Sequence, residues 1–141
     1  VEGRGVVRKV MGMTILDETY NSNPEAARYA LEWLMSFQGP KVAVLGDMLE
    51  LGEHSGDFHR QLGAQAALSG LKLLVTVGER AQAIAEAAVR SAMPESAVRH
   101  FRTAEECRDA LKDLIHPGDV VLFKASRGIA LEKAVPRQSA V

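Results

Sequence analysis

Two acids and two asparagines gather in one short segment, LDETYNSNPEAA, at residues 16–27. A carboxylate here, from Asp17 or Glu18, can accept hydrogen bonds from both hydroxyls of a ribose. Asn21 and Asn23 offer donors and acceptors for a nucleobase edge or an amide. Asn23 also precedes a proline, which is typical of a helix N-cap. Because a cap needs only one residue, the whole cluster indicates a ligand site.

A second polar segment, LGDMLELGEHSGDFH at residues 45–59, follows an apolar run and is longer than a simple connection requires. Asp47 is the candidate functional acid because it comes directly after the predicted strand. His54 and His59 are five residues apart, which is poor spacing for two ligands on one helix face. We therefore predict no metal site in this segment.

A third segment, FKASRG at residues 123–128, combines two cations and a hydroxyl. Lys124, Ser126 and Arg127 follow another apolar run and precede a segment that we expect to be helical. Two cations and a hydroxyl at a helix N-terminus favour a carboxylate or a phosphate. A surface ion pair with a capping serine is the simpler alternative for the same residues.

These polar segments need a scaffold, and apolar runs alternate with segments of helical periodicity throughout the chain. Strands separated by helices, and apolar on both faces, indicate an α/β fold: a Rossmann-like three-layer domain with a mostly parallel sheet of about six strands and helices on both faces. The ligand crevice of such sheets lies beyond the carboxyl ends of the strands, where all three polar segments fall. The expected strands cover 5–10, 13–18 (after a bend at Gly12), 41–47, 71–78, 97–101 and 120–126, and the expected helices cover 24–37, 56–69, 79–92, 103–115 and a last one from Arg127 onward.

Composition limits the class of protein. A chain of 141 residues with 47% hydrophobic residues can build one core, so we expect a single domain over residues 1–141 with a frayed tail at 136–141. The single cysteine, Cys107, excludes a disulfide framework and every multi-cysteine metal motif. A net charge of −1 favours neither nucleic acid nor an anionic membrane as a partner. Because no apolar run approaches the roughly 20 residues of a membrane span and no signal-peptide core is visible, we expect a cytoplasmic protein.

The sequence contains neither of the two familiar phosphate-binding loops, G-x-x-x-x-G-K-[ST] and G-x-G-x-x-G. This segment therefore cannot by itself cradle nucleotide phosphates in either familiar way. The chain also begins at Val1 rather than methionine, so we expect it to be a piece of a longer protein and to be inactive alone.

Five segments together resemble the C-terminal domain of the Mur ligases, in particular of the branch that adds a D-alanyl-D-alanine dipeptide. The Tyr-Asn-x-Asn-Pro and Leu-Gly-Asp-Met-Leu-Glu-Leu-Gly strings are specific to this branch, and the resemblance covers nearly the whole chain. The segments are GR at 3–4, DETYNSNP at 17–24, VLGDMLELGEHS at 44–55, TVGERA at 76–81 and GDVVLFKASRG at 118–128.

The resemblance implies an ATP-dependent ligase of bacterial cell-wall precursor synthesis, expected as a monomer. In that family the carboxylate of UDP-MurNAc-tripeptide attacks the γ-phosphate of ATP, which gives an acyl phosphate and ADP. The amine of D-Ala-D-Ala then displaces phosphate. The central domain of the family holds Mg²⁺ and the phosphates, and the C-terminal domain closes over the nucleotide, which excludes water from the labile acyl phosphate.

The resemblance also implies roles for single residues. Arg4 matches a catalytic arginine on the phosphate side of the nucleotide, where a cation offsets growing negative charge. Glu18 occupies the position of the ribose-binding acid, which is usually Asp, and Asp17 is the alternative. Asn21 and Asn23 would border the adenine and the ribose.

At the end of the chain, Lys124, Ser126 and Arg127 match a Lys-Gly-Ser-Arg string that the family places near the amine substrate. Ala125 stands in this sequence where the family has glycine. Asp47 matches a family position that we group with the substrate-binding residues.

Three alternatives stay open. A response-regulator receiver has an acid pair, a later phosphoacceptor Asp and a Lys, which Asp17–Glu18, Asp47 and Lys124 imitate, although only one helix separates the pair from Asp47 here. A folylpolyglutamate synthetase C-terminal domain shares the architecture, but its His-Asn-Pro string is absent from this sequence. A binding module without catalysis is the third alternative.

Overall fold

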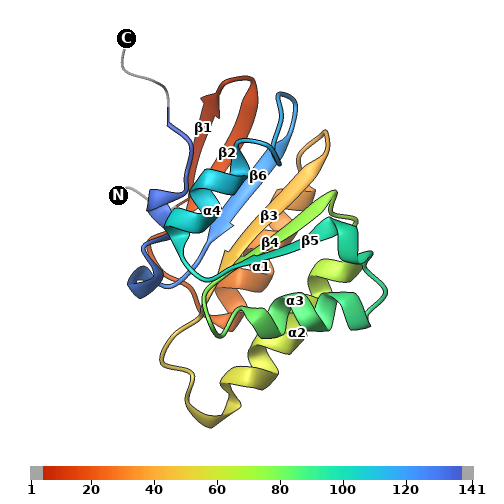
Figure 1. The fold of residues 1–141 in the computed structure, drawn as a ribbon, viewed down its shortest axis with the longest axis vertical. Helices are drawn as coiled ribbons and strands as arrows, with labels where there is room; N and C mark the ends of the chain where they lie inside the picture. Colours follow the sequence, from red (N-terminus) through yellow and green to blue (C-terminus); the bar gives the residue numbers. More distant parts are fainter. Residues whose placement is uncertain (1–4, 138–141) are drawn as a thin grey trace.

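Six strands form one sheet in the order β1-β2-β6-β3-β4-β5 in the computed structural model, which describes residues 5–137 (Figure 1). The β1–β2 pair is antiparallel and all other pairs are parallel. The predicted mostly parallel sheet is therefore confirmed. The strands are β1 Val6–Val10, β2 Met13–Glu18, β3 Lys41–Gly46, β4 Leu73–Val77, β5 Val98–Phe101 and β6 Val120–Lys124.

The predicted bend at Gly12 is a two-residue hairpin turn between β1 and β2. Val10 pairs with Met13, and both residues between them have positive φ, 50° at Met11 and 81° at Gly12. This combination matches the right-handed twist of the flanking strands, and glycine at the second position relieves the backbone strain.

Four α-helices connect the strands: α1 Pro24–Met35, α2 Ser55–Leu68, α3 Gln82–Arg90 and α4 Ala104–Leu111. The predicted cap at Asn23 is confirmed, and Thr103 caps α4 in the same way. The Ala26 N–H donates to Asn23 Oδ1 at 2.9 Å, and the Glu106 N–H donates to Thr103 Oγ1 at 3.1 Å. Each cap satisfies a backbone donor that has no partner within its own helix.

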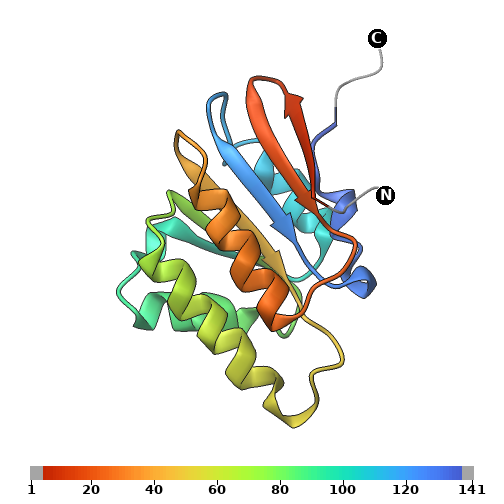
Figure 2. The same cartoon turned by 180° about the vertical axis from the view of Figure 1, so that it is seen from behind.

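The two faces of the sheet belong to two separate hydrophobic clusters. Successive side chains of a strand point to opposite faces, so Ile15 and Leu16 of β2 enter different clusters. Buried residues of α1, α2 and α3 pack on the face of Leu16, and Figure 2 shows α1 and α2 lying across it. Helix α4 covers the opposite face, where burial raises the pKa of the Cys107 thiol to about 12 and leaves it an inert packing group.

The helix predicted from Arg127 onward is wrong. Two short 3₁₀ turns, Arg127–Ile129 and Leu131–Lys133, stand in its place. Ala130 between them has φ +56°, a left-handed conformation that an α-helix does not contain. The break lets the side chain of Leu131 reach the core on the α4 side, where it is fully buried. Burial of this leucine thus overrides the helical periodicity.

The predicted frayed tail at 136–141 lies partly outside the described residues. Val135 is buried, and Pro136 and Arg137 line a cavity beside α4. Across residues 5–137, no helix combines the length and the apolarity that a bilayer crossing requires.

Close contact between α2 and α3 depends on Gly63. A methyl group at this position would lie 2.9 Å from Ala87 Cβ and would collide with the Ile84 carbonyl oxygen. At Gly56 in the same helix, the added methyl would meet only the flexible guanidinium of Arg60, at 3.0 Å.

We therefore expect Gly63→Ala to lower the free energy of unfolding by about 3 kcal/mol, since a backbone carbonyl cannot yield to the added methyl group. Gly56→Ala is the matched control and should change stability by at most about 1 kcal/mol, in the stabilising direction. Urea unfolding of both variants measures the difference. Equal effects of the two substitutions would contradict the packing described here.

Candidate functional site

The parallel register brings residues from distant parts of the sequence to one edge of the sheet. Glu18, the last residue of β2, pairs with Lys124, the last residue of β6, and Lys124 pairs on its other side with Leu45 of β3. The carboxyl ends of three neighbouring strands therefore present their following loops together. Such an edge is where α/β sheets bind ligands.

Asp17 and Glu18 differ sharply in their surroundings. Asp17 is fully buried, and its two oxygens accept hydrogen bonds from Arg8 Nη2 at 2.7 Å and from Thr19 Oγ1 at 2.7 Å. The Glu18 side chain is 26% exposed, and its Oε2 lies 3.6 Å from Lys124 Nζ. Glu18 is thus the acid of the pair that a ligand can reach, whereas Asp17 fixes the start of the loop.

Lys124 is a buried cation that holds the loop after β2. Its side chain is 6% exposed, and its ammonium donates to the Asn21 carbonyl oxygen at 2.6 Å. Burial lowers the pKa of Lys124, and the negative charge of Glu18 opposes that shift. The ammonium therefore sits between a backbone oxygen and a partly exposed carboxylate.

Ser126 connects the three loops at this edge. Its hydroxyl accepts from the Leu49 N–H at 2.9 Å and donates to the Ser22 carbonyl oxygen at 3.3 Å, and its backbone N–H donates to the Asp47 carbonyl oxygen at 2.9 Å. The residue is 4% exposed. Because only a three-residue turn follows it, the α-helix N-terminus expected as an anion site at Ser126 is not formed.

Ala125 replaces a glycine of the family pattern without backbone strain, because its φ is not positive. Ala125 is not one of the non-glycine residues that have positive φ within residues 5–137. Its methyl group is fully buried against the α4-side core. The loop after β6 therefore accommodates alanine without a left-handed backbone.

Asp47 lies just beyond β3 and is 2% exposed. Its Oδ1 accepts from the Ala81 N–H at 2.7 Å, and its Oδ2 lies 3.7 Å from Arg80 Nη1. The backbone of Gly78, with φ +110°, lies against the Asp47 side chain, and a Cβ at this position would collide with the carboxylate. In this conformation the carboxylate joins the loops after β3 and β4.

His59 gives the loop after β3 a further support, which the sequence did not reveal. The ring is fully buried; Nε2 accepts from the Met48 N–H at 3.0 Å, and Nδ1 lies 2.6 Å from the Ser55 carbonyl oxygen. This pairing requires the tautomer with the proton on Nδ1. In the sequence His59 stands out only as a candidate metal ligand, and its spacing from His54 argues against that role.

The exposed part of the site consists of an arginine stacked on a tyrosine. The Arg127 guanidinium carbon lies 4.9 Å from the centre of the Tyr20 ring, within range of a cation–π contact. Together with Thr19 and Glu132 these residues line a pocket of about 190 Å³. Sequence reasoning missed Glu132 because the chain was expected to be helical there.

The two asparagines occupy exposed positions beside this pocket. Asn21 is exposed, and its backbone carbonyl is held by Lys124. Asn23 is also exposed, but its side-chain oxygen caps α1. Arg4 lies outside the described residues, so its placement is not known from this structure.

The arrangement suits the nucleoside part of a ligand better than a metal ion. Glu18 is an accessible acceptor for ribose hydroxyls, and Tyr20 and Arg127 offer a flat cationic surface. Within the described part of the chain, no group of three or more His, Cys, Asp or Glu side chains could hold a metal ion.

Comparison with known proteins relates this site to one family. The model of the family described as "Mur ligase, glutamate ligase domain" matches residues 3–127. The UDP-N-acetylmuramoyl-tripeptide--D-alanyl-D-alanine ligase of Bacillus subtilis is 33% identical over 132 residues, which are 92% of this chain and 29% of that protein. The chain thus spans less than a third of the length of this relative.

Solved structures of MurF ligases also resemble this chain. The structure of MurF ligase from Thermotoga maritima in complex with ADP superposes with a TM-score of 0.79 at 35% identity, covering 95% of this chain and 30% of that one. Crystal structure II of MurF from Acinetobacter baumannii gives a TM-score of 0.85 at 33% identity, with the same coverage of both chains.

Two more distant structures share the fold alone. A bifunctional folylpolyglutamate synthase/dihydrofolate synthase from Yersinia pestis is 23% identical, with a TM-score of 0.63 over 94% of this chain and 30% of that one. A domain of a putative ligase from Haemophilus ducreyi is 18% identical with a TM-score of 0.59; this chain covers 97% of that solved chain, so the fold exists as a separate domain. Family membership thus rests on the family model and on the relatives above 30% identity: the chain belongs to the Mur ligase family and carries its glutamate ligase domain.

Proposed function

We propose that this chain is the C-terminal domain of an ATP-dependent ligase that joins D-Ala-D-Ala to UDP-MurNAc-tripeptide in the cytoplasm. The relatives that share 30% identity or more carry the name of this reaction. The structural observation that supports the proposal is the accessible Glu18 beside Lys124, at the ends of two parallel strands. When bound, ATP would supply the phosphoryl group that activates the tripeptide carboxylate, with Mg²⁺ held by the remainder of the protein.

In this proposal Glu18 accepts hydrogen bonds from the ribose hydroxyls. Asp17 is assigned no contact with the ligand, because it is fully buried and its oxygens accept hydrogen bonds from Arg8 and Thr19. Asn21 borders the adenine, and Asn23 contributes mainly by capping the helix that follows. Arg4 is assigned to the phosphate side of the nucleotide on the family resemblance alone.

Arg127 is the residue of the Lys124–Arg127 segment that is placed to contact the amine substrate. Its guanidinium is exposed and lies over the Tyr20 ring, so it can pair with the carboxylate of a dipeptide. Lys124 and Ser126 are buried and engaged with loop backbone, so we assign them the positioning of this surface. Asp47 acts in the same way through the backbone of Ala81.

Phosphate release tests the reaction. We expect the full-length protein that carries this domain to release phosphate from ATP only when both UDP-MurNAc-tripeptide and D-Ala-D-Ala are present. The 141-residue chain alone should release none, because it has no phosphate-binding loop. Release that is indifferent to the dipeptide would overturn the proposed amine substrate.

Substitution of the two neighbouring acids should have separate effects. In the full-length protein, Glu18→Gln should raise KM for ATP about tenfold and leave KM for D-Ala-D-Ala unchanged, since a charged hydrogen bond to the ribose is lost. Asp17→Asn should instead lower the free energy of unfolding by about 2 kcal/mol, because it breaks a buried ion pair. Steady-state kinetics and urea unfolding of both variants check this; a change of KM for ATP confined to Asp17→Asn would reverse the assignment.

Arg127 offers a test of the amine-substrate surface. Arg127→Gln should raise KM for D-Ala-D-Ala about tenfold, and Arg127→Lys should recover only part of the loss because lysine lacks the planar fork. Arg99→Gln, an exposed arginine on β5 at the opposite edge of the sheet, is the matched control. Full activity of Arg127→Gln at low dipeptide concentration would count against this role.

A further inference from the structure

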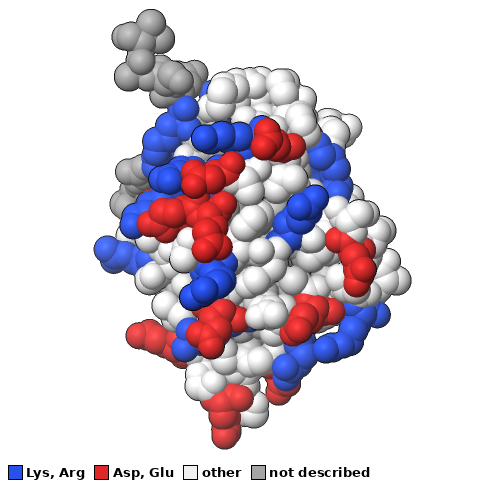
Figure 3. Space-filling view, in the orientation of Figure 1, with Lys and Arg blue, Asp and Glu red and all other residues white. Residues whose placement is uncertain are grey.

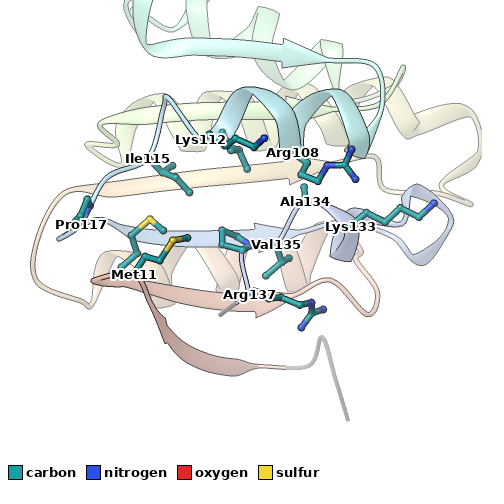
Figure 4. Close-up of a pocket in the computed structure, with 12 residues that line it drawn as sticks. Met11, Arg108, Lys112, Ile115, Pro117, Lys133, Ala134, Val135 and Arg137 are labelled. Carbon is teal, nitrogen blue, oxygen red and sulfur yellow. The ribbon is translucent and has the colours of Figure 1, made fainter. Parts of the chain in front are cut away.

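A second cavity lies on the α4 side of the sheet, apart from the site just described. Its volume is about 510 Å³, and it is enclosed by α4, the β1–β2 hairpin turn and the segment at 133–137 (Figure 4). None of its lining residues also lines the pocket of Tyr20 and Arg127. The proposed ligase chemistry makes no use of it.

The floor of this cavity is apolar and rigid. Met13, Leu111, Ile115 and Val135 line it, and all four belong to the hydrophobic cluster on this face, with exposures of 8% or less. Because these side chains are already packed by the fold, the wall is formed before any ligand arrives. Cavities of this size with apolar walls are typical of small-molecule sites.

The charged side chains of the cavity are concentrated toward one end. Four cations line it, Arg108, Lys112, Lys133 and Arg137, and no acid lines it within residues 5–137. Figure 4 shows Arg108, Lys133 and Arg137 at one end and Met11 at the other. The cavity therefore offers an apolar end and a cationic end to a single ligand.

Two of these cations, Arg108 and Lys133, form surface ion pairs with neighbouring acids. Arg108 Nε lies 3.2 Å from Asp109 Oδ1, and Lys133 Nζ lies 3.3 Å from Glu105 Oε2, with all four side chains about half exposed. Such surface pairs contribute little to stability and exchange readily for another anion.

We infer that this cavity binds a small amphipathic anion, with an apolar chain or ring on the Met13–Val135 floor and a carboxylate or phosphate at the end lined by Arg108 and Lys133. A nucleic acid does not suit this face, because Figure 3 shows acidic and basic side chains interspersed on it instead of a continuous basic surface. The inference does not depend on the proposed ligase activity, so either can fail without the other.

Decanoate is the probe for this site. Titration calorimetry of the 141-residue chain at low ionic strength should give saturable binding of one decanoate per chain, and acetate, which has the head group without the chain, should show none. Decanol, which has the chain without the charge, should bind at least threefold more weakly. Decyl phosphate in a parallel titration identifies the preferred head group, since either ranking against decanoate supports the site.

Substitutions locate the binding. The double variant Arg108→Gln/Lys133→Gln should weaken decanoate binding roughly three- to tenfold and leave decanol binding unchanged, because only the ionic contacts are removed. Met11→Asn should weaken both ligands; Met11 is 65% exposed, and asparagine tolerates its left-handed turn, so the fold is retained.

Two matched controls guard against nonspecific adsorption. Arg99→Gln removes an exposed cation, and Leu68→Asn removes an 84% exposed apolar side chain, both away from the cavity. Neither should change decanoate binding. The inference is overturned if decanoate binds without saturation, or if the Arg108/Lys133 double variant and the Met11 variant bind it as tightly as the two controls do.

Discussion

The parallel pairing of β2 with β6 is the constraint on which the site depends. It sets the last residue of one strand, Glu18, directly beside the last residue of the other, Lys124. Both strands are central in the sheet and carry buried side chains on both faces, so a shift of one residue would exchange the two hydrophobic clusters. The cost of that exchange fixes the position of the exposed carboxylate.

Buried polar groups then convert this register into a fixed loop surface. Ser126, Asp47 and Lys124 direct their hydrogen bonds to backbone atoms of neighbouring loops rather than to solvent. Because an unpaired buried donor is costly, these hydrogen bonds restrict the loops to few conformations. The exposed Arg127 and the partly buried Tyr20 lie above this layer of hydrogen-bonded loops.

Strand β2 joins the two proposed ligand sites. Met13 at its start lies in the floor of the α4-side cavity, and Glu18 at its end belongs to the proposed nucleotide site. The two sites use different physical means: the edge site relies on polar loops, whereas the cavity relies on an apolar floor with cations at one end. Because the two pockets share no lining residue, a mutation in one need not disturb the other.

The sequence by itself determined the α/β class, the bend at Gly12 and the cap at Asn23, because these depend on neighbours within a few residues. It failed after Arg127, where burial of Leu131 overrode a helical pattern. The choice between Asp17 and Glu18 was also beyond the sequence: adjacent acids have the same chemistry, and only the tertiary positions of Arg8 and Thr19 occupy one and leave the other accessible.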